Sequence, residues 1–93
     1  MPEFLVELYV PKGDGEAVAQ SARLARLAAR ELTREGRSVH YMRSIFVPDD
    51  ETCFLFYEAT SADDVAEAVR RASLPFDRVA LAVAGREGEE EQS

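Results

Sequence analysis

Short runs in which neighbouring positions are mostly apolar predict four β-strands. The first run covers residues 4–10 and stops at Pro11. Residues 39–59 contain two more runs, joined at residues 48–50 by a Pro-Asp-Asp turn. The last run covers residues 77–84. A strand with one solvated face should alternate apolar and polar residues more cleanly. Both faces of the predicted sheet must therefore be covered.

Two helices are predicted between these strands. Apolar and small residues recur at four-residue steps over residues 15–35, with Asp14 placed as the N-cap and Gly36 placed just past the end. Ser61 is placed to cap a second helix, which Pro75 should terminate. Each helix then connects two strands.

The predicted order, β-α-β-β-α-β, is that of the ferredoxin-like α+β fold. Right-handed crossovers place both helices on one face of a four-stranded antiparallel sheet. The opposite face stays bare, and its apolar residues favour closure against a second copy, in a homodimer of the dimeric α/β-barrel type. We expect a single domain over residues 1–84, followed by an acidic, disordered tail over residues 85–93.

Charge and composition argue against several classes of protein. The net charge of −7 disfavours nucleic acid as a partner, because phosphate binding needs a concentrated positive field. No apolar run approaches the ~20 residues of a membrane span, and the N-terminal segment lacks the basic start of a signal peptide. The single cysteine, Cys53, allows no intramolecular disulfide, which favours a cytoplasmic location.

Strand alternation sorts the candidate site residues by face. Glu7 and Tyr9 should point to the bare face, and the charge of Glu58 places it there as well. Arg43 shares a face with Tyr41; if that face is the bare one, two carboxylates, an arginine and two tyrosines lie in one layer. The apolar walls of this layer are Leu5, Phe54 and Phe56. An apolar pocket with convergent polar groups predicts a ligand site; the alternative is an ionic cluster at a dimer seam.

The two most reactive side chains have simpler explanations. His40, the only histidine, begins a strand, where a surface or packing role is favoured over that of a general base or metal ligand. Cys53 lies among aromatic and aliphatic residues and is interpreted as a buried apolar side chain, not a nucleophile. We therefore assign no catalytic residues.

The first helix carries one positive feature. At about 100° per residue, four arginines fall within a sector of about 80°. They are Arg23, Arg26, Arg30 and Arg34. We interpret them as the solvated outer face of the helix; the alternative is a stripe for an anion or an acidic partner.

Several short motifs, spread over residues 3–84, point to a known family. They are Tyr41-x-x-Ser44-x-x-Val47, Asp49-Asp50-x-x-Cys53 and Glu58-Ala59-x-Ser61-Ala62, with Phe4-Leu5-Val6-Glu7 and Arg71-Ala72-x-x-Pro75. In these motifs the chain resembles a family of small bacterial proteins typed by a nickel-binding ferredoxin-like dimer. None of the motifs is a catalytic signature.

The resemblance implies a homodimer with its sheets face to face and, in some members, a bound transition metal. The histidines of such members, in the second helix and before its proline, correspond here to Val69 and Leu74. Imidazole is a natural nickel ligand. We therefore expect no resident cofactor, and nickel is the alternative, with His40 as its candidate ligand.

Together these observations favour a small dimeric binding module that holds a small ligand, or alternatively a transition metal, between facing sheets. A second hypothesis is a cofactor-free dimeric α/β-barrel monooxygenase or isomerase, which would use Glu7, Tyr9, Tyr41 or Glu58 as its acid or base. A third is an interaction unit that uses the arginine stripe or the acidic tail.

Overall fold

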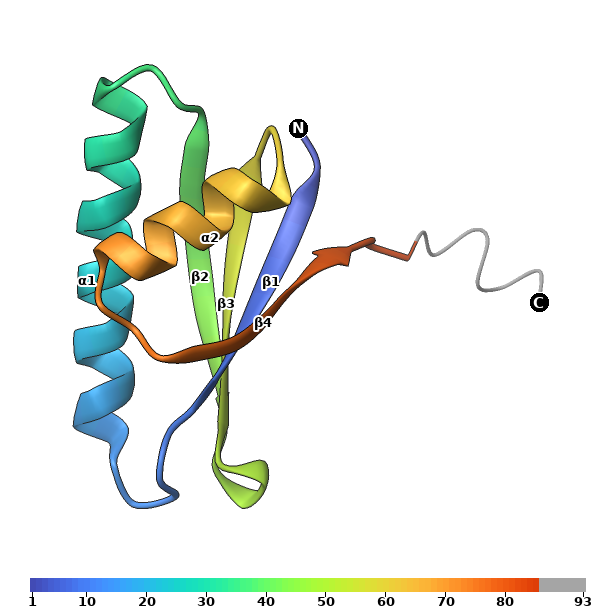
Figure 1. Cartoon of the computed structure of the whole chain (residues 1–93). Coiled ribbons are helices and arrows are strands. Elements are labelled where there is room, and N and C mark those ends of the chain that lie inside the picture. The colour runs from blue at the N-terminus through green and yellow to red at the C-terminus, as the bar shows by residue number, and fades with distance from the viewer. Residues whose placement is uncertain (86–93) are drawn as a thin grey trace.

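The computed structural model describes residues 1–85 of the 93-residue chain. Its strands and helices follow one another in the predicted order (Figure 1). Their bounds are β1 Glu3–Tyr9, α1 Gly15–Arg34, β2 Val39–Val47, β3 Thr52–Ala59, α2 Ala62–Arg71 and β4 Phe76–Ala82, with a 3₁₀ turn at Pro48–Asp50. The predicted ferredoxin-like α+β fold is confirmed. The predicted tail lies, from residue 86 onward, outside the described residues.

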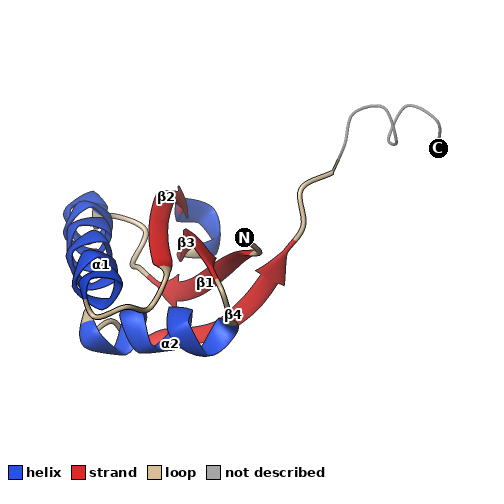
Figure 2. Ribbon diagram, turned by 90° about the horizontal axis from the view of Figure 1, so that it is seen from above, coloured by secondary structure: helices blue, strands red, loops and turns tan. Residues whose placement is uncertain are grey.

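The strands form one antiparallel sheet in the order β2-β3-β1-β4. β1 lies in the middle and pairs with β3 on one side and β4 on the other, so β2 and β4 are the edges. Seen from above, both helices lie on the same side of the sheet (Figure 2). α1 packs mainly against β2, whereas α2 packs against β4 and β3. The other side of the sheet is left uncovered within the described chain.

Helix α1 is held at both ends by its own sequence. The Asp14 carboxylate accepts a hydrogen bond from the Ala17 N–H at 3.1 Å, which caps the first turn. At the far end Gly36 adopts φ +95°, and the Arg37 N–H reaches back to the Leu32 carbonyl at 3.0 Å. This is a Schellman closure, for which glycine has no steric cost. No helix of the described residues is long and apolar enough to cross a membrane.

Helix α2 begins as predicted but ends earlier. The Ser61 hydroxyl accepts from the Asp64 N–H at 3.2 Å. The helix then stops at Arg71 and not at Pro75. Ser73 takes up the left-handed conformation with φ +60°, and the Leu74 N–H bonds to the Val69 carbonyl at 3.2 Å. The same Schellman closure that ends α1 therefore ends α2 before the proline is reached.

The core lies between the helices and one face of the sheet. Its strand residues are Phe4, Val6, Leu8, Val39, Cys53, Leu55, Tyr57 and Ala59, joined by Val10 just after β1, and its helix residues include Ala25, Ala28, Ala29, Leu32, Val65, Ala68 and Val69. The predicted burial of Cys53 is confirmed. The small side chains of α1 let this helix lie close to β2.

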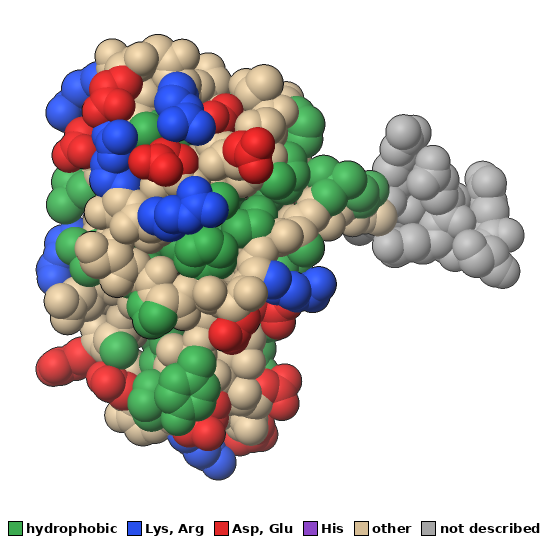
Figure 3. Space-filling view, viewed as in Figure 1, with side chains coloured by type: hydrophobic (Ala, Val, Ile, Leu, Met, Phe, Trp, Pro, Cys, Tyr) green, Lys and Arg blue, Asp and Glu red, His purple; other side chains and the backbone are tan. Residues whose placement is uncertain are grey.

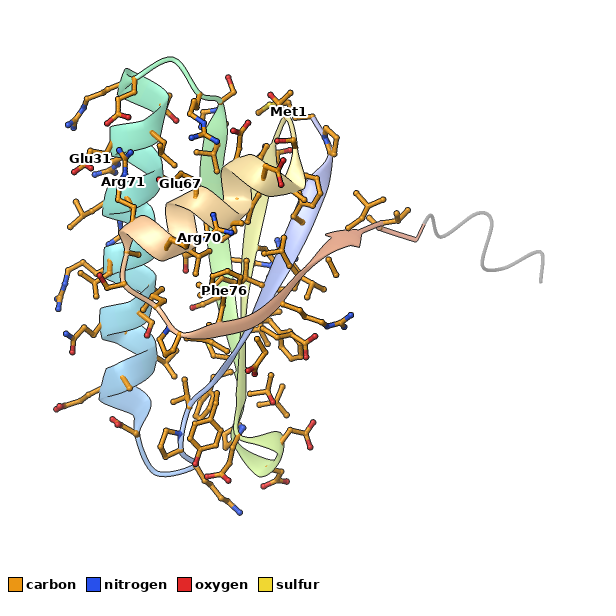
Figure 4. All side chains as sticks on the ribbon, viewed as in Figure 1. Met1, Glu31, Glu67, Arg70, Arg71 and Phe76 are labelled. Atoms are coloured by element: carbon orange, nitrogen blue, oxygen red, sulfur yellow. The ribbon has the colours of Figure 1, made fainter. Side chains whose placement is uncertain are left out.

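An ionic cluster joins the two helices on their outer side. Arg71 of α2 lies beside Glu31 of α1 and Glu67 of its own helix (Figure 4). Its Nη1 is 2.6 Å from Oε2 of Glu35 and 3.3 Å from Oε1 of Glu31. These contacts raise the pKa of Arg71 and lower the pKa of Glu35, chiefly through their mutual hydrogen bond. The cluster fixes the end of α1 against the end of α2.

Candidate functional site

The uncovered face of the sheet presents a regular array of side chains. Residues directly opposite each other on neighbouring strands share a face, with Cβ atoms about 4.5–5.5 Å apart. Three rows therefore cross this face in strand order: Ile45–Phe54–Glu7–Arg78, Arg43–Phe56–Leu5–Ala80 and His40–Glu58–Glu3–Ala82. Apolar side chains fill the middle, and charged side chains surround them. We call this surface the open face.

Arg43 lies on the open face, as the predicted layer requires. Its guanidinium carbon is 4.5 Å from the centre of the Phe56 ring, which is a cation–π geometry. Arg43 makes no ion pair with any described residue. The predicted pairing of Arg43 with carboxylates is therefore replaced by stacking on an aromatic ring.

Glu7 also lies on the open face, but its partner is a residue that the sequence did not reveal. The Glu7 carboxylate accepts a charge-assisted hydrogen bond from Nε of Arg78 on the neighbouring strand β4. Glu7 and Arg78 face each other in the regular part of the β1–β4 register, and the register shifts only beyond them, where Asp77 is the extra residue of β4. The pattern along either strand alone gave no signal for which residues of β1 and β4 lie opposite each other.

The third row gathers the remaining charges. Glu58 lies opposite His40 on one side and Glu3 on the other. The placement of Glu58 on the open face is confirmed. Two carboxylates directly opposite each other are mutually unfavourable without a positive or hydrogen-donating neighbour. This end of the open face is therefore suited to a hydrogen-bond donor or a positive group.

Tyr41 is the one site residue that the structure places elsewhere. A bulge interrupts β2 between Tyr41 and Arg43, so that Met42 has no partner on β3. The simple alternation of faces along β2 is therefore broken at the bulge, and Tyr41 and Arg43, two residues apart, point to opposite faces of the sheet. Tyr41 turns to the helix side, where its ring meets Tyr57 edge-on at 5.7 Å between centroids. The predicted sharing of one face by Tyr41 and Arg43 is wrong for this reason.

Tyr9 lies beyond the three rows, at the end of β1 opposite Thr52. Its side chain is 59% exposed. Tyr9 therefore lies outside the apolar centre of the open face.

Two buried groups on the helix side are chemically quiet. Cys53 is fully buried, and desolvation raises the pKa of its thiol. Tyr57 is also fully buried, and desolvation, followed by the neighbouring Tyr41, raises the pKa of its phenol. The Tyr57 hydroxyl makes no hydrogen bond with any described residue. Both side chains therefore stay protonated at neutral pH.

The fold and the open face together define the class of this protein. It is a small α+β protein with two helices on one side of an antiparallel sheet and, on the other side, an apolar surface bordered by charged side chains. Residues 4–81 match the family described as nickel responsive protein SCO4226-like, and the chain belongs to this family. The resemblance seen in the sequence is confirmed.

One solved structure supports the fold assignment. The crystal structure of SCO4226 from Streptomyces coelicolor A3(2) matches 90% of this chain and 99% of its own, with a TM-score of 0.69 and 20% sequence identity. At that identity the likeness shows a shared fold. No curated protein matches this chain.

The described residues do not fit a resident nickel ion within one chain. No three His, Cys, Asp or Glu side chains among residues 1–85 are grouped so as to hold a metal. Val69 and Leu74, where the resemblance implies histidines, are buried apolar residues. His40 has Glu58 opposite it, and one imidazole beside one carboxylate is a sparse donor set for a transition metal.

Proposed function

We propose that this protein is a homodimeric binding module that holds a small organic ligand between two facing open faces. The observation that carries the proposal is the open face itself. Five of its central side chains, Leu5, Ile45, Phe54, Phe56 and Ala80, are apolar, and the protein's own helices all lie on the other side of the sheet. A continuous apolar surface of this kind is typical of an interaction site.

The end of β4 adds support for a second copy. Leu81 and Val83 are 62% and 84% exposed, although they continue an apolar strand at the edge of the sheet. Figure 3 shows apolar side chains extending along this side of the molecule. An exposed apolar edge strand is an aggregation hazard unless a partner covers it. Leu81 lies opposite the buried Phe4 and therefore on the helix side of β4, so the dimer removes this hazard if the second copy also pairs along the edge of β4.

The charges around the open face suggest the chemistry of the ligand. Arg43 offers a guanidinium at one side of the apolar centre, and Glu58 offers an acceptor two residues along β3 from Phe56. The Glu7–Arg78 pair is already internally satisfied. The ligand that fits has an apolar, flat body, an acidic group for Arg43 and a hydrogen-bond donor for Glu58.

The enzyme hypothesis gains less from this geometry. Of the four groups that it would use, Glu7 is held by Arg78 and Tyr41 lies on the helix side. A general acid or base must be free to reach a substrate proton. Binding is therefore the function that the arrangement favours.

The dimer is tested by light scattering coupled to gel filtration, with a matched pair of variants. Ile45 on the open face is 45% exposed, and Leu27 on α1 is 52% exposed. Because both side chains are this exposed in one chain, we expect each to accept a charge without loss of the fold. We expect a dimeric wild type, a monomeric Ile45→Glu variant and a dimeric Leu27→Glu variant. A monomeric wild type, or equal disruption by both variants, contradicts the proposed interface.

The ligand is tested by native mass spectrometry of gently purified protein, with and without added Ni²⁺ and Zn²⁺. We expect an organic adduct on the dimer that is lost in Arg43→Gln and kept in Arg23→Gln, a control on the outer face of α1. A dimer that carries no adduct and binds nothing in a compound screen contradicts the binding role and leaves the interface standing. Stoichiometric metal that is lost in His40→Ala contradicts the organic ligand.

A further inference from the structure

Helix α1 and the first residues of edge strand β2 border an open groove of about 380 Å³. Arg26, Arg30 and Arg34 line the helix wall, and residues 39–41 line the strand wall. This volume falls within the usual range for small-molecule sites, about 300–1,000 Å³. We call it the arginine groove. It lies along the helix side of the molecule and does not use the apolar centre of the open face.

The three arginines form a ladder along one side of α1. Residues four apart rise by about 6 Å and turn by about 40° around the helix axis, so the ladder is roughly 12 Å long. Thr33, between two of its members, donates a hydrogen bond from its hydroxyl to the Val39 carbonyl at 2.9 Å. This bond joins α1 to β2 at the floor of the groove and fixes the separation of its walls.

The arginines of the groove are not neutralised by ion pairs with the described residues. Five other basic side chains, Lys12, Arg37, Arg70, Arg71 and Arg78, each have an acidic partner, whereas Arg23 and Arg43, which lie outside the groove, have none among residues 1–85. Arg26, Arg30 and Arg34 pair with no carboxylate among residues 1–85, and no Asp or Glu lines the groove. In a chain with a net charge of −7, three unpaired guanidiniums beside one hollow form a local positive field.

We propose that the arginine groove binds a small organic anion that carries two or more phosphate or carboxylate groups. A guanidinium presents a planar fork of donors that matches the oxygens of either group. A ladder roughly 12 Å long can engage two such groups at once. The half-buried Tyr41 offers an aromatic surface to the uncharged part of the ligand. The solvated outer face expected from the sequence thereby acquires a role along part of its length.

The inference is independent of the proposed function. The arginine groove lies between α1 and the β2 edge, and a second copy on the open face covers the opposite side of the sheet. The absence of anion binding would therefore leave the proposed dimer intact, and a monomeric protein would leave the proposed anion site intact.

The test is isothermal titration calorimetry of the full chain with pyrophosphate, ATP and citrate at low ionic strength. We expect saturable binding that weakens with added salt. Arg30→Gln removes the middle guanidinium and should lower the affinity about tenfold or more, since charge-assisted hydrogen bonds are the strong ones. Arg23→Gln is the matched control: it removes the same charge from α1 but does not line the groove. Measured at an ionic strength of about 0.15 M, where the Debye length is about 8 Å, it should change the affinity by less than about twofold.

Backbone amide shifts in NMR spectra locate the site, and circular dichroism confirms that both variants are folded. Perturbations centred on Ala29, Thr33 and Val39 support the proposal. Stronger binding of pyrophosphate and ATP than of citrate identifies a phosphate ligand, and the reverse order a carboxylate ligand. Absence of saturable binding by all three probes overturns the proposal. Equal losses in Arg30→Gln and Arg23→Gln also overturn it, because they reveal a general charge effect.

Discussion

The guanidinium of Arg43 rests on the ring of Phe56, its neighbour across β2 and β3, with 4.5 Å between the guanidinium carbon and the ring centre. The contact covers one face of an aromatic side chain that would otherwise be exposed to water. It also keeps the positive charge at the border of the apolar centre. The strength of this contact therefore depends on whether water, a second sheet or a ligand covers the open face.

A double-mutant cycle with Arg43→Gln and Phe56→Leu should measure this contact. We expect a coupling of about 0.5–1 kcal/mol if the pair faces water and about 2 kcal/mol if a second sheet or a ligand removes water from it. Urea unfolding of the four proteins, at high and low protein concentration, gives both values. A coupling near zero at every concentration would show that the stacking contributes nothing to stability.

The C-terminal cap of α2 should be improvable. Ser73 adopts φ +60°, a conformation that favours glycine, whereas the equivalent position after α1 is already Gly36. Ser73→Gly should raise the free energy of unfolding by about 0.5–1 kcal/mol, and Gly36→Ala should lower it by about 1 kcal/mol. Thermal or urea unfolding measures both changes. Destabilisation by Ser73→Gly would mean that the serine side chain has a stabilising contact of its own.

The buried Tyr57 hydroxyl should be dispensable. It makes no hydrogen bond with the described residues, and an unsatisfied buried polar group costs about 1–3 kcal/mol. Tyr57→Phe leaves a small void, so we expect the free energy of unfolding to stay level or to rise by up to about 1 kcal/mol. Tyr9→Phe, at a 59% exposed side chain, is the control. A loss of more than about 1 kcal/mol in Tyr57→Phe would contradict the unsatisfied state of the hydroxyl.

Cys53 should react with thiol reagents only when the protein opens. Its side chain is fully buried and desolvation raises the pKa of the thiol, so both access and thiolate fraction are low. We expect labelling by a disulfide reagent to be slow in buffer at pH 8 and rapid in concentrated urea. Equal rates in the two conditions would show that the core around β3 opens readily.

The Arg71 cluster should make part of the stability depend on pH. The pKa of Glu35 is lower in the fold than its ordinary value of 4.5, mainly because of the hydrogen bond from Arg71. A carboxylate with a lowered pKa stabilises the fold above its ordinary pKa, and this stabilisation is lost as the pH falls below 4.5 through the lowered value.

We therefore expect Glu35→Gln to be less stable than the wild type at pH 6 and to approach it at pH 3. Asp50→Asn, at an exposed carboxylate without an ion pair among the described residues, is the control and should follow the wild type. Melting temperatures across this pH range measure the difference. A gap between Glu35→Gln and the wild type that is unchanged at pH 3 would contradict the role of ionised Glu35.

The fold could be predicted because its signals are local. The caps at Asp14 and Ser61 and the glycine at Gly36 lie next to the elements that they bound. The alternation along β1 correctly separated its buried set from Leu5 and Glu7. The early end of α2 was missed because Ser73 replaces the usual glycine at the closing position.

The site was predicted less completely because its geometry depends on pairing between strands. The bulge at Met42 reverses the phase of β2, and no residue type near it signals the extra position. Alternation therefore wrongly put Tyr41 and Arg43 on one face, while the charge of Glu58 placed that residue correctly. The Glu7–Arg78 pair depends on the register between two strands that lie far apart in sequence.

The bulge at Met42 also lets the two halves of β2 serve two different surfaces of the protein. Residues 39–41 border the arginine groove, with His40 also opposite Glu58 at the end of the open face, and the half of β2 from Arg43 onward presents Arg43 and Ile45 to the open face. Because the extra residue makes the side-chain directions in one half independent of those in the other, substitutions in one half can change one surface and leave the orientation of the other half's side chains unchanged. A protein designer could use the same bulge to change the binding specificity of one surface at a time within the nine residues of β2.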